Sequence, residues 1–320
     1  MRHAVVDIGT NTCLMLIAEF TDAGTLKILN DVHAIARLGA GVDSAKIISQ
    51  DAIDRLIAIL LNHKQILSDA GTTSIHLVAT SAMRDAGNRQ AIIDQVKAVT
   101  GFEIELLSGS DESLWSFRGA TCGIESLESI NGITTLDIGG GSTELSFGKK
   151  GEYSSGVSMN IGAVRMTERF LAYRNESSLA TARKFIRSEI EKNVKTTVRP
   201  QKLIAVAGTP TSIAAIKLSL QSFDPIKIHS GVISVNELDK INTEIFTLTR
   251  EALLTKYPAI HPSRADILPA GALILQETLQ FLRLNEFQVS TFGLRYGVMI
   301  GDAERFLGIG KQSWMIERAN

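Results

Sequence analysis

Apolar and polar residues alternate along the chain in blocks whose spacing predicts an α/β fold. Short apolar runs broken by Gly, Asn and Asp turns predict three consecutive strands, at about residues 3–9, 13–20 and 25–35. Ser49 then precedes residues 50–70, where apolar side chains recur at helical spacing. The rest of this part consists of predicted strands at about 74–80 and 102–107 and predicted helices at about 88–100 and 111–122. The predicted order is βββαβαβα.

The same order restarts near Ile133, which indicates an internal duplication. The second set consists of strands at about 133–138, 143–148 and 152–158, helices at about 162–171 and 177–196, a strand at 203–207 and a helix from Thr211. Residues 235–284 are largely helical by pattern, with a late strand at 287–290 and a last helix at 295–306. No low-complexity linker separates the halves, so we place the boundary within residues 123–131. The pattern predicts two related α/β domains.

Composition narrows the class of protein. At 320 residues, with 44% hydrophobic and 21% charged residues and a formal net charge of -1, the chain fits a soluble globular protein of two domains rather than a nonspecific nucleic-acid binder. It has two cysteines, no segment that resembles a signal peptide and no apolar run long enough to cross a membrane, which favours a reduced, cytoplasmic location. The six histidines lack metal-ligand spacing, so a zinc enzyme is not expected.

Residues 137–144 read DIGGGSTE after a predicted strand, a pattern that suits phosphate binding. Successive glycines remove every Cβ from a turn, so that backbone N–H groups approach phosphate oxygens closely, and hydroxyls add donors. The residues that offer these groups are Gly139, Gly140, Gly141, Ser142 and Thr143. Asp137 is placed to hold Mg²⁺ through water. The alternatives are a plain glycine-rich hairpin and an aspartate that caps a turn.

Residues 5–14 read VVDIGTNTCL and repeat that segment in register, with Asp7 in the place of Asp137. The small and polar residues of this copy are Gly9, Thr10, Asn11 and Thr12. Taken alone, the copy is equally well explained as an ordinary hairpin turn. Because it recurs, the pair predicts two half-sites that face one phosphorylated ligand in a cleft between the halves.

A third loop, Gly208 and Thr209, follows a predicted strand and opens a helix, where backbone N–H groups stabilise anions. Helix capping by Thr209 explains the same residues without a ligand. Glu112 lies in the first turn of another predicted helix. Its carboxylate either interacts favourably with the helix dipole or faces the cleft and orients an attacking water. Arg84 follows the predicted strand at 74–80. Its side chain either binds phosphate in the cleft or is exposed to solvent.

Further strings carry a resemblance to a known family. They are ATSAMR (79–84), IELLSGSDES (104–113), LDIGGGSTEL (136–145), IGAVRMTERF (161–170), RADILPAG (264–271) and GLRYG (293–297). With the duplicated DIG turns and the AGT at 207–209, the chain resembles the exopolyphosphatase / guanosine pentaphosphate phosphohydrolase (Ppx/GppA) family of the actin, sugar-kinase and Hsp70 superfamily. The resemblance implies two duplicated ribonuclease-H-like (actin-like) domains with the active site in the cleft between them. We expect residues 1–124 and 125–301 to form them, with a last helix at about 302–320 packing back on the first.

The resemblance also implies residue roles. Glu112 corresponds to the family's general base for water, Asp137 and Glu144 to the acidic residues that organise Mg²⁺ and water, and Arg84 to the family arginine of the first domain. Asp7, with the first loop, and Gly208 and Thr209 correspond to phosphate-binding positions. Two departures stand out: Pro210 removes one amide donor from the third loop, and Asp111 replaces a common Glu. The helical C-terminal region of longer members is absent, as in a short, two-domain form.

The implied reaction is hydrolysis of a terminal phosphoanhydride, with Mg²⁺ or Mn²⁺ as cofactor and polyphosphate as the preferred substrate over guanosine pentaphosphate (pppGpp). A small-molecule kinase of the same superfold and a noncatalytic polyphosphate or alarmone sensor are the rival functions. Nucleic acid and membrane are not expected as partners, and the resemblance is compatible with a homodimer. Long polyphosphate would need a basic track that leads from the cleft. The candidates, which lie either on such a track or on ordinary solvated helix faces, are Arg165, Arg169, Lys184, Arg187, Lys195, Arg199 and Lys202.

Overall fold

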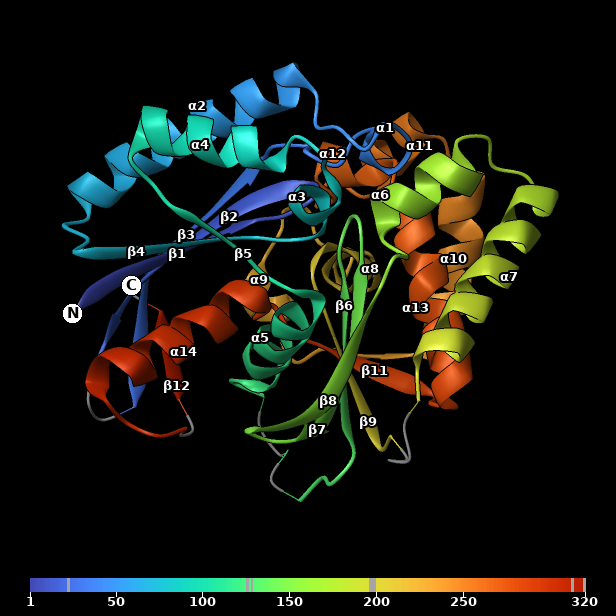
Figure 1. Cartoon of the computed structure of the whole chain (residues 1–320). Coiled ribbons are helices and arrows are strands. Elements are labelled where there is room, and N and C mark those ends of the chain that lie inside the picture. The colour runs from blue at the N-terminus through green and yellow to red at the C-terminus, as the bar shows by residue number, and fades with distance from the viewer. Residues whose placement is uncertain (22–23, 125–126, 128, 196–199, 312–313, 319–320) are drawn as a thin grey trace.

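The computed structural model describes residues 1–21, 24–124, 127, 129–195, 200–311 and 314–318, which form two six-stranded sheets with helices on both faces of each (Figure 1). The first sheet is built from β1 (Arg2–Ile8), β2 (Thr12–Phe20), β3 (Thr25–Ile35), β4 (Ser74–Ala79), β5 (Ile104–Leu106) and β12 (Met315–Arg318). Its order is β12-β3-β2-β1-β4-β5, with β1 antiparallel to β2 and parallel to β4.

The second sheet repeats this plan. It contains β6 (Ile133–Ile138), β7 (Thr143–Lys149), β8 (Glu152–Met159), β9 (Lys202–Val206), β10 (Val232–Ser234) and β11 (Glu286–Val289). Its order, β10-β11-β9-β6-β7-β8, holds the same 3-2-1-4-5 arrangement as the first, with the extra strand at the opposite edge. The prediction of a duplicated α/β fold is therefore confirmed.

Helices cover both faces of the first sheet. They are α1 (Val42–Ala45), α2 (Gln50–Asp69), α3 (Ser81–Asp85), α4 (Arg89–Thr100), α5 (Gly109–Thr121) and α14 (Leu294–Leu307). α2 begins at Ser49, whose side chain accepts a hydrogen bond from the Ala52 amide, and its apolar stripe is buried with the inner faces of β1 and β4. α14 packs against the other face, together with α5. We call this sheet and its helices the first lobe.

The second lobe holds the second sheet and the remaining helices. They are α6 (Ala163–Met166), the π-helical turn η1 (Thr167–Leu171), α7 (Glu176–Asn193), α8 (Gly208–Lys217), α9 (Pro225–Ile228), α10 (Val235–Thr247), α11 (Arg250–Lys256), α12 (Pro262–Ala265) and α13 (Leu268–Leu282). α13 is rich in apolar residues and almost wholly buried, and it packs against α7 and α10. Within the described part of the chain, no helix combines the length and apolarity that crossing a bilayer requires.

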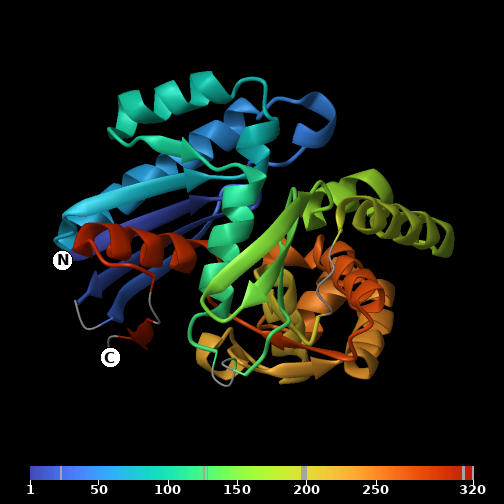
Figure 2. The same ribbon diagram turned by 60° about the horizontal axis from the view of Figure 1, so that its bottom comes forward.

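Helix α5 lies between the lobes, as the two views agree (Figures 1 and 2). Its Phe117 and Ala120 pack with residues of β6 and β9, whereas Trp115 packs with the α14 cluster. Gly119 lies so close to the Gly293 carbonyl that a Cβ would lie 2.0 Å from its oxygen. One helix thus fixes the second sheet relative to α14 and the first.

The C-terminal segment differs from the expected single helix at 302–320. α14 ends at Leu307, where Gly308 adopts the left-handed conformation (φ 64°) that stops a helix. Residues Met315–Arg318 then pair in parallel with β3 as β12. This strand could not be predicted, because four residues at a sheet edge carry almost no periodicity.

Candidate functional site

The two aspartates of the repeat occupy equivalent places in the two sheets. Asp7 lies in β1 beside Val78 of β4, and Asp137 lies in β6 beside Val206 of β9. Each is the next-to-last residue of its strand, just before the turn. The first turn is closed by a 2.8 Å hydrogen bond from the Gly9 amide to the Thr12 carbonyl.

All three predicted loops line one cavity of about 510 Å³ between the lobes. The predicted site residues that line it are Asp7, Gly9, Thr10, Asn11, Thr12, Glu112, Asp137, Gly139, Gly140, Ser142, Gly208 and Thr209. Residues more than 200 positions apart in the sequence therefore converge on a single space. Such a cavity, with backbone amides and a few acidic groups, is suited to a phosphorylated ligand.

The third loop enters the cavity at the N-terminus of α8, where unpaired backbone N–H groups favour anions. Ala207, just before the helix, has a positive φ of 73°, an uncommon conformation that is often found at functional sites. Gly208 lets the Arg264 guanidinium approach the loop closely, because a Cβ at this position would lie 1.5 Å from it and would displace that side chain. The close fit places a cation directly on the third loop.

Four predicted site residues lie outside the cavity lining. Thr143 donates its hydroxyl hydrogen to the Ile161 carbonyl, so it serves the local structure. Gly141 faces the first lobe, where a Cβ would lie 2.5 Å from the Ser81 Oγ. Arg84 and Glu144 lie beside cavity residues and are described next.

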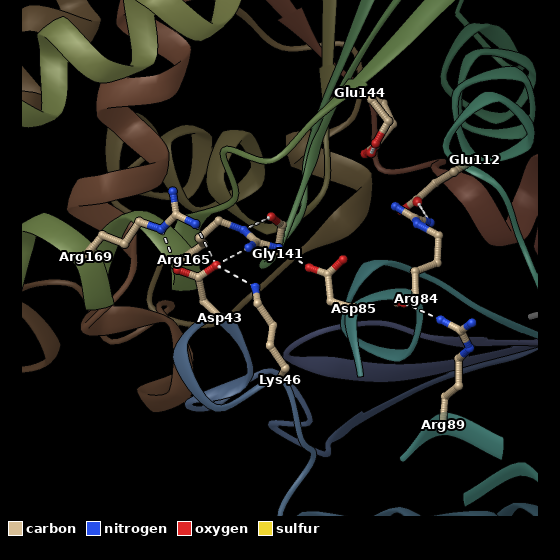
Figure 3. Close-up of polar contacts among 11 residues, drawn as sticks. Asp43, Lys46, Arg84, Asp85, Arg89, Glu112, Gly141, Glu144, Arg165 and Arg169 are labelled. Atoms are coloured by element: carbon tan, nitrogen blue, oxygen red, sulfur yellow. Dashed lines mark hydrogen bonds and ion pairs between the residues drawn. The ribbon is translucent and has the colours of Figure 1, made fainter. Parts of the chain in front are cut away.

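Glu112 is held at the start of α5 by local capping and by one arginine. Ser108 caps the helix, and the Glu112 side chain points inward and is buried. The Arg84 Nη1 lies 2.5 Å from Glu112 Oε2 and also donates to the Leu107 carbonyl at 3.1 Å (Figure 3). Burial raises the pKa of Glu112 to about 7; the Arg84 charge opposes that rise, and the charge of Asp137 adds to it. A carboxylate with this pKa suits general-base chemistry near neutral pH.

Asp137 and Glu144 face each other directly across the antiparallel pair β6–β7, so their side chains share one face. Ser116 donates to Asp137 Oδ2 at 2.5 Å, and Ser158 donates to Glu144 Oε1 at 2.7 Å. Burial raises the pKa of both carboxyls, and the charges of Glu112 and Asp137 raise that of Glu144 further. Neither forms an ion pair with any residue that the structure describes.

Asp7 completes the acidic cluster. Burial raises its pKa to about 7, with further contributions from the charges of Glu112 and Asp137. Its Oδ1 is buried and has no hydrogen-bond partner in the part of the chain that the structure describes. A group of four carboxyls with raised pKa values attracts a cation, because a positive charge would relieve both the burial cost and their repulsion.

The donor set fits a hard divalent ion that keeps several waters. Mg²⁺ takes oxygen ligands and is typically held by one or two carboxylates plus substrate phosphate, as Asp137 and Glu144 would provide. Among the described residues, no group of three or more His, Cys, Asp or Glu is arranged as a complete metal site. The chain therefore offers part of a coordination shell, which water and substrate would complete.

Two arginines that line the cavity were not singled out from the sequence. Arg264 is partly buried and has no ion-pair partner among the residues that the structure describes, and desolvation lowers its pKa to about 10. Arg295 lies at the start of α14 and forms a two-pronged ion pair with Asp31, at 3.1 and 2.9 Å. Both arginines belong to strings that carry the family resemblance, RADILPAG and GLRYG, but the spacing of these strings along the chain does not show that they meet at one cavity.

Several residues of the suggested basic track have other roles in the structure. Arg165 and Arg169 bind acidic residues of the first lobe, and Arg187 binds the buried Glu277 of α13 at 2.7 Å. Arg199 lies outside the described residues. The same cavity is also lined by mixed side chains, which include Ile35, Phe223, Pro225, Ala259, His261, Ile267 and Arg318.

Comparison with known proteins gives consistent findings. Residues 16–306 match the Ppx/GppA phosphatase family. Exopolyphosphatase 2 of Mycobacterium tuberculosis is 31% identical, over 93% of this chain and 98% of that protein. The guanosine-5'-triphosphate,3'-diphosphate pyrophosphatase of Vibrio parahaemolyticus is 25% identical, over 93% of this chain and 58% of that protein.

Solved structures show the same fold. A Ppx/GppA family member from Aquifex aeolicus superposes with a TM-score of 0.81 at 28% identity, over 96% of this chain and 98% of that one. An exopolyphosphatase from Cytophaga hutchinsonii superposes with a TM-score of 0.87 at 26% identity, over 98% of this chain and the whole of that one. The likeness thus extends over both lobes.

Proposed function

The chain belongs to the Ppx/GppA phosphatase family, and from this premise we propose that it is an exopolyphosphatase, which hydrolyses inorganic polyphosphate and releases terminal orthophosphate. The observation that carries the proposal is Glu112: a buried carboxylate with a pKa near 7, at a cavity lined by three anion-binding loops. A positioned base beside bound phosphate is what attack by water on a phosphoanhydride requires.

In the proposed reaction the terminal phosphates bind to the turn amides of both lobes and to the N-terminus of α8. Arg264 adds a positive charge that has no competing carboxylate among the described residues. Glu112 accepts a proton from the attacking water. Arg84, which does not itself line the cavity, holds the carboxylate in place. Bond cleavage releases orthophosphate, and the shortened chain leaves as a phosphate oxyanion.

We propose Asp137 and Glu144 as the residues that would hold a divalent ion, Mg²⁺ or Mn²⁺. When bound there, the ion would neutralise charge on the phosphoryl oxygens. Ser116 and Ser158 orient the two carboxylates from behind, through their hydrogen bonds. Asp7, on the facing turn, places a third negative charge near this position.

A second candidate substrate is pppGpp. It is supported by the Vibrio parahaemolyticus relative and by the cavity lining, in which Phe223, Pro225 and Ile267 offer apolar surface for a nucleoside. We rank it second because the 31%-identical relative is an exopolyphosphatase.

The test is orthophosphate release by the purified protein with Mg²⁺, measured in parallel on short polyphosphate, long polyphosphate, pppGpp and ATP. We expect the highest kcat/KM on polyphosphate. A higher value on pppGpp would reverse the ranking of the two substrates. Phosphate transfer to an acceptor instead of water would indicate a kinase, and tight binding without release from any substrate would indicate a sensor.

A further inference from the structure

A compact group of charged residues joins the two lobes beside the cavity. Arg165 of α6 contacts Asp43 of α1 through Nη1 and Asp85 of α3 through Nη2, and Arg169 of η1 contacts Asp43 with both Nε and Nη2 (Figure 3). We call these four residues the interlobe latch. Every one of these ion pairs connects the second lobe to the first.

Arg165 also binds the second phosphate loop. Its Nε donates to the Gly141 carbonyl at 2.7 Å, so all three guanidinium nitrogens are engaged. The first turn of α6 is bonded to the same loop by amide–carbonyl hydrogen bonds, from Ala163 to Gly139 at 2.9 Å and from Val164 to Gly140 at 2.8 Å. A guanidinium suits this task because its planar donors address several acceptors in fixed directions.

On the first lobe, the latch residue Asp85 is next to the arginine that contacts the base Glu112. Asp85 follows Arg84 in the five-residue helix α3, and Arg84 holds Glu112. Gly141 itself packs on the first lobe, where a Cβ would lie 2.9 Å from the Thr10 Oγ1. The loop that binds phosphate in one lobe is therefore tied to the element that orients the base in the other.

Burial distinguishes Arg165 from an ordinary surface arginine. It is only 5% exposed, so the loss of either partner would leave a charge away from water. Arg169 is more exposed and holds the pKa of Asp43 below its usual range through its hydrogen bonds. Such networks contribute a defined geometry more reliably than they contribute stability.

We propose that Arg165 is a positioning residue for hydrolysis: by tying the second phosphate loop to Asp43 and Asp85, it sets the distance between bound phosphate and the Glu112 base. This inference rests on the proposed function. Small displacements of reacting groups reduce turnover strongly, whereas binding of a polyanion to several loops tolerates them. The latch should therefore act on kcat more than on KM.

The test compares Arg165→Gln with Arg183→Gln. Arg183 also joins two elements by charged hydrogen bonds, to Glu277 at 2.9 Å and to Gln276 at 2.8 Å, but within the second lobe. For Arg165→Gln we expect kcat on short polyphosphate to fall about ten- to a hundredfold with little change in KM. Arg165→Lys should recover part of the loss, and Arg183→Gln should retain wild-type kcat.

A second readout separates this inference from the proposed function. X-ray scattering of the substrate-free protein should show a larger radius of gyration for Arg165→Gln than for the wild type or Arg183→Gln, whether or not polyphosphate is hydrolysed. If the wild type hydrolyses none of the substrates, the proposed function fails, and scattering alone decides whether the latch holds the lobes. If the wild type is active and Arg165→Gln keeps its kcat, the inference is wrong while the function stands.

Should Arg165→Gln fail to fold, Asp85→Asn replaces it, because Asp85 is partly exposed and the change leaves Arg165 one carboxylate. It should lower kcat in the same direction by a smaller factor. A kcat equal to that of the wild type in folded Asp85→Asn would overturn the inference.

Discussion

At the scale of single residues, the catalytic proposal depends on the contact between Glu112 and Arg84. Burial raises the pKa of Glu112 to about 7, and the Arg84 charge limits that rise. The sequence identified both residues, the first by family resemblance and the second by its place after a strand. Their contact could not be predicted, because 28 positions separate them and the short helix α3 that carries Arg84 has no periodicity.

Replacing Arg84 should shift the pH dependence of the reaction. The base acts when it is deprotonated, and without the arginine its pKa rises further, so the acid limb of kcat/KM for Arg84→Gln should move to higher pH than in the wild type. Arg89→Gln is the matched control, since the Arg89 side chain donates to the Arg84 backbone carbonyl and not to Glu112. An acid limb at the same pH in all three proteins would exclude Arg84 as the group that tunes Glu112.

We expect Arg264 to lower the stability of the folded protein and to strengthen the binding of polyphosphate. A partly buried arginine with no ion-pair partner among the described residues destabilises the folded state, as its pKa, lowered to about 10 by desolvation, indicates. Arg264→Met should therefore raise the midpoint of thermal unfolding and raise KM for polyphosphate. Arg250→Gln, which removes an exposed arginine of α11, should change neither. A lower unfolding midpoint together with an unchanged KM would show that Arg264 is structural.

At the scale of elements, the long helices and the strands of the repeat follow the sequence closely, because their apolar stripes are regular. α2 extends over Gln50–Asp69 and β1 over Arg2–Ile8, close to the predicted ranges. The short elements α1, α3 and β12 escaped prediction, yet α1 and α3 carry half of the interlobe latch. Elements of four or five residues are stabilised by tertiary contacts, so their local sequence holds little signal.

Because of His63 in helix α2, the folded state should become less stable at acidic pH. This side chain is fully buried, neither ring nitrogen has a hydrogen-bond partner among the residues that the structure describes, and burial lowers its pKa to about 4. Its unfolded form binds a proton near pH 6.5, so the free energy of unfolding should fall as pH drops from about 6.5 to 4, by roughly 3 kcal/mol from this group.

Chemical denaturation at a series of pH values checks this. His63→Leu should lose that part of the pH dependence, whereas Gln65→Leu, at an exposed position of the same helix, should keep it. Parallel pH profiles for wild type and His63→Leu would contradict the assignment.

At the scale of the whole molecule, duplication explains both the fold and the site. The two sheets share one strand order, and the turns after β1 and β6 meet across the cavity. The sequence revealed the repeat and its facing aspartates, but the latch and the roles of Arg264 and Arg295 follow only from the packing of the lobes. Domain limits at 1–124 and 125–301, a cytoplasmic location and a homodimer stay predictions.

The most direct test of the central claim is orthophosphate release from polyphosphate by wild type, Glu112→Gln and Asp111→Asn at saturating Mg²⁺. Asp111 is the matched control, an exposed acid next to Glu112 that binds Ser108. We expect release by the wild type and Asp111→Asn, and a kcat for Glu112→Gln lower by about 10²–10⁴ with the fold intact. Undiminished release by folded Glu112→Gln would contradict it.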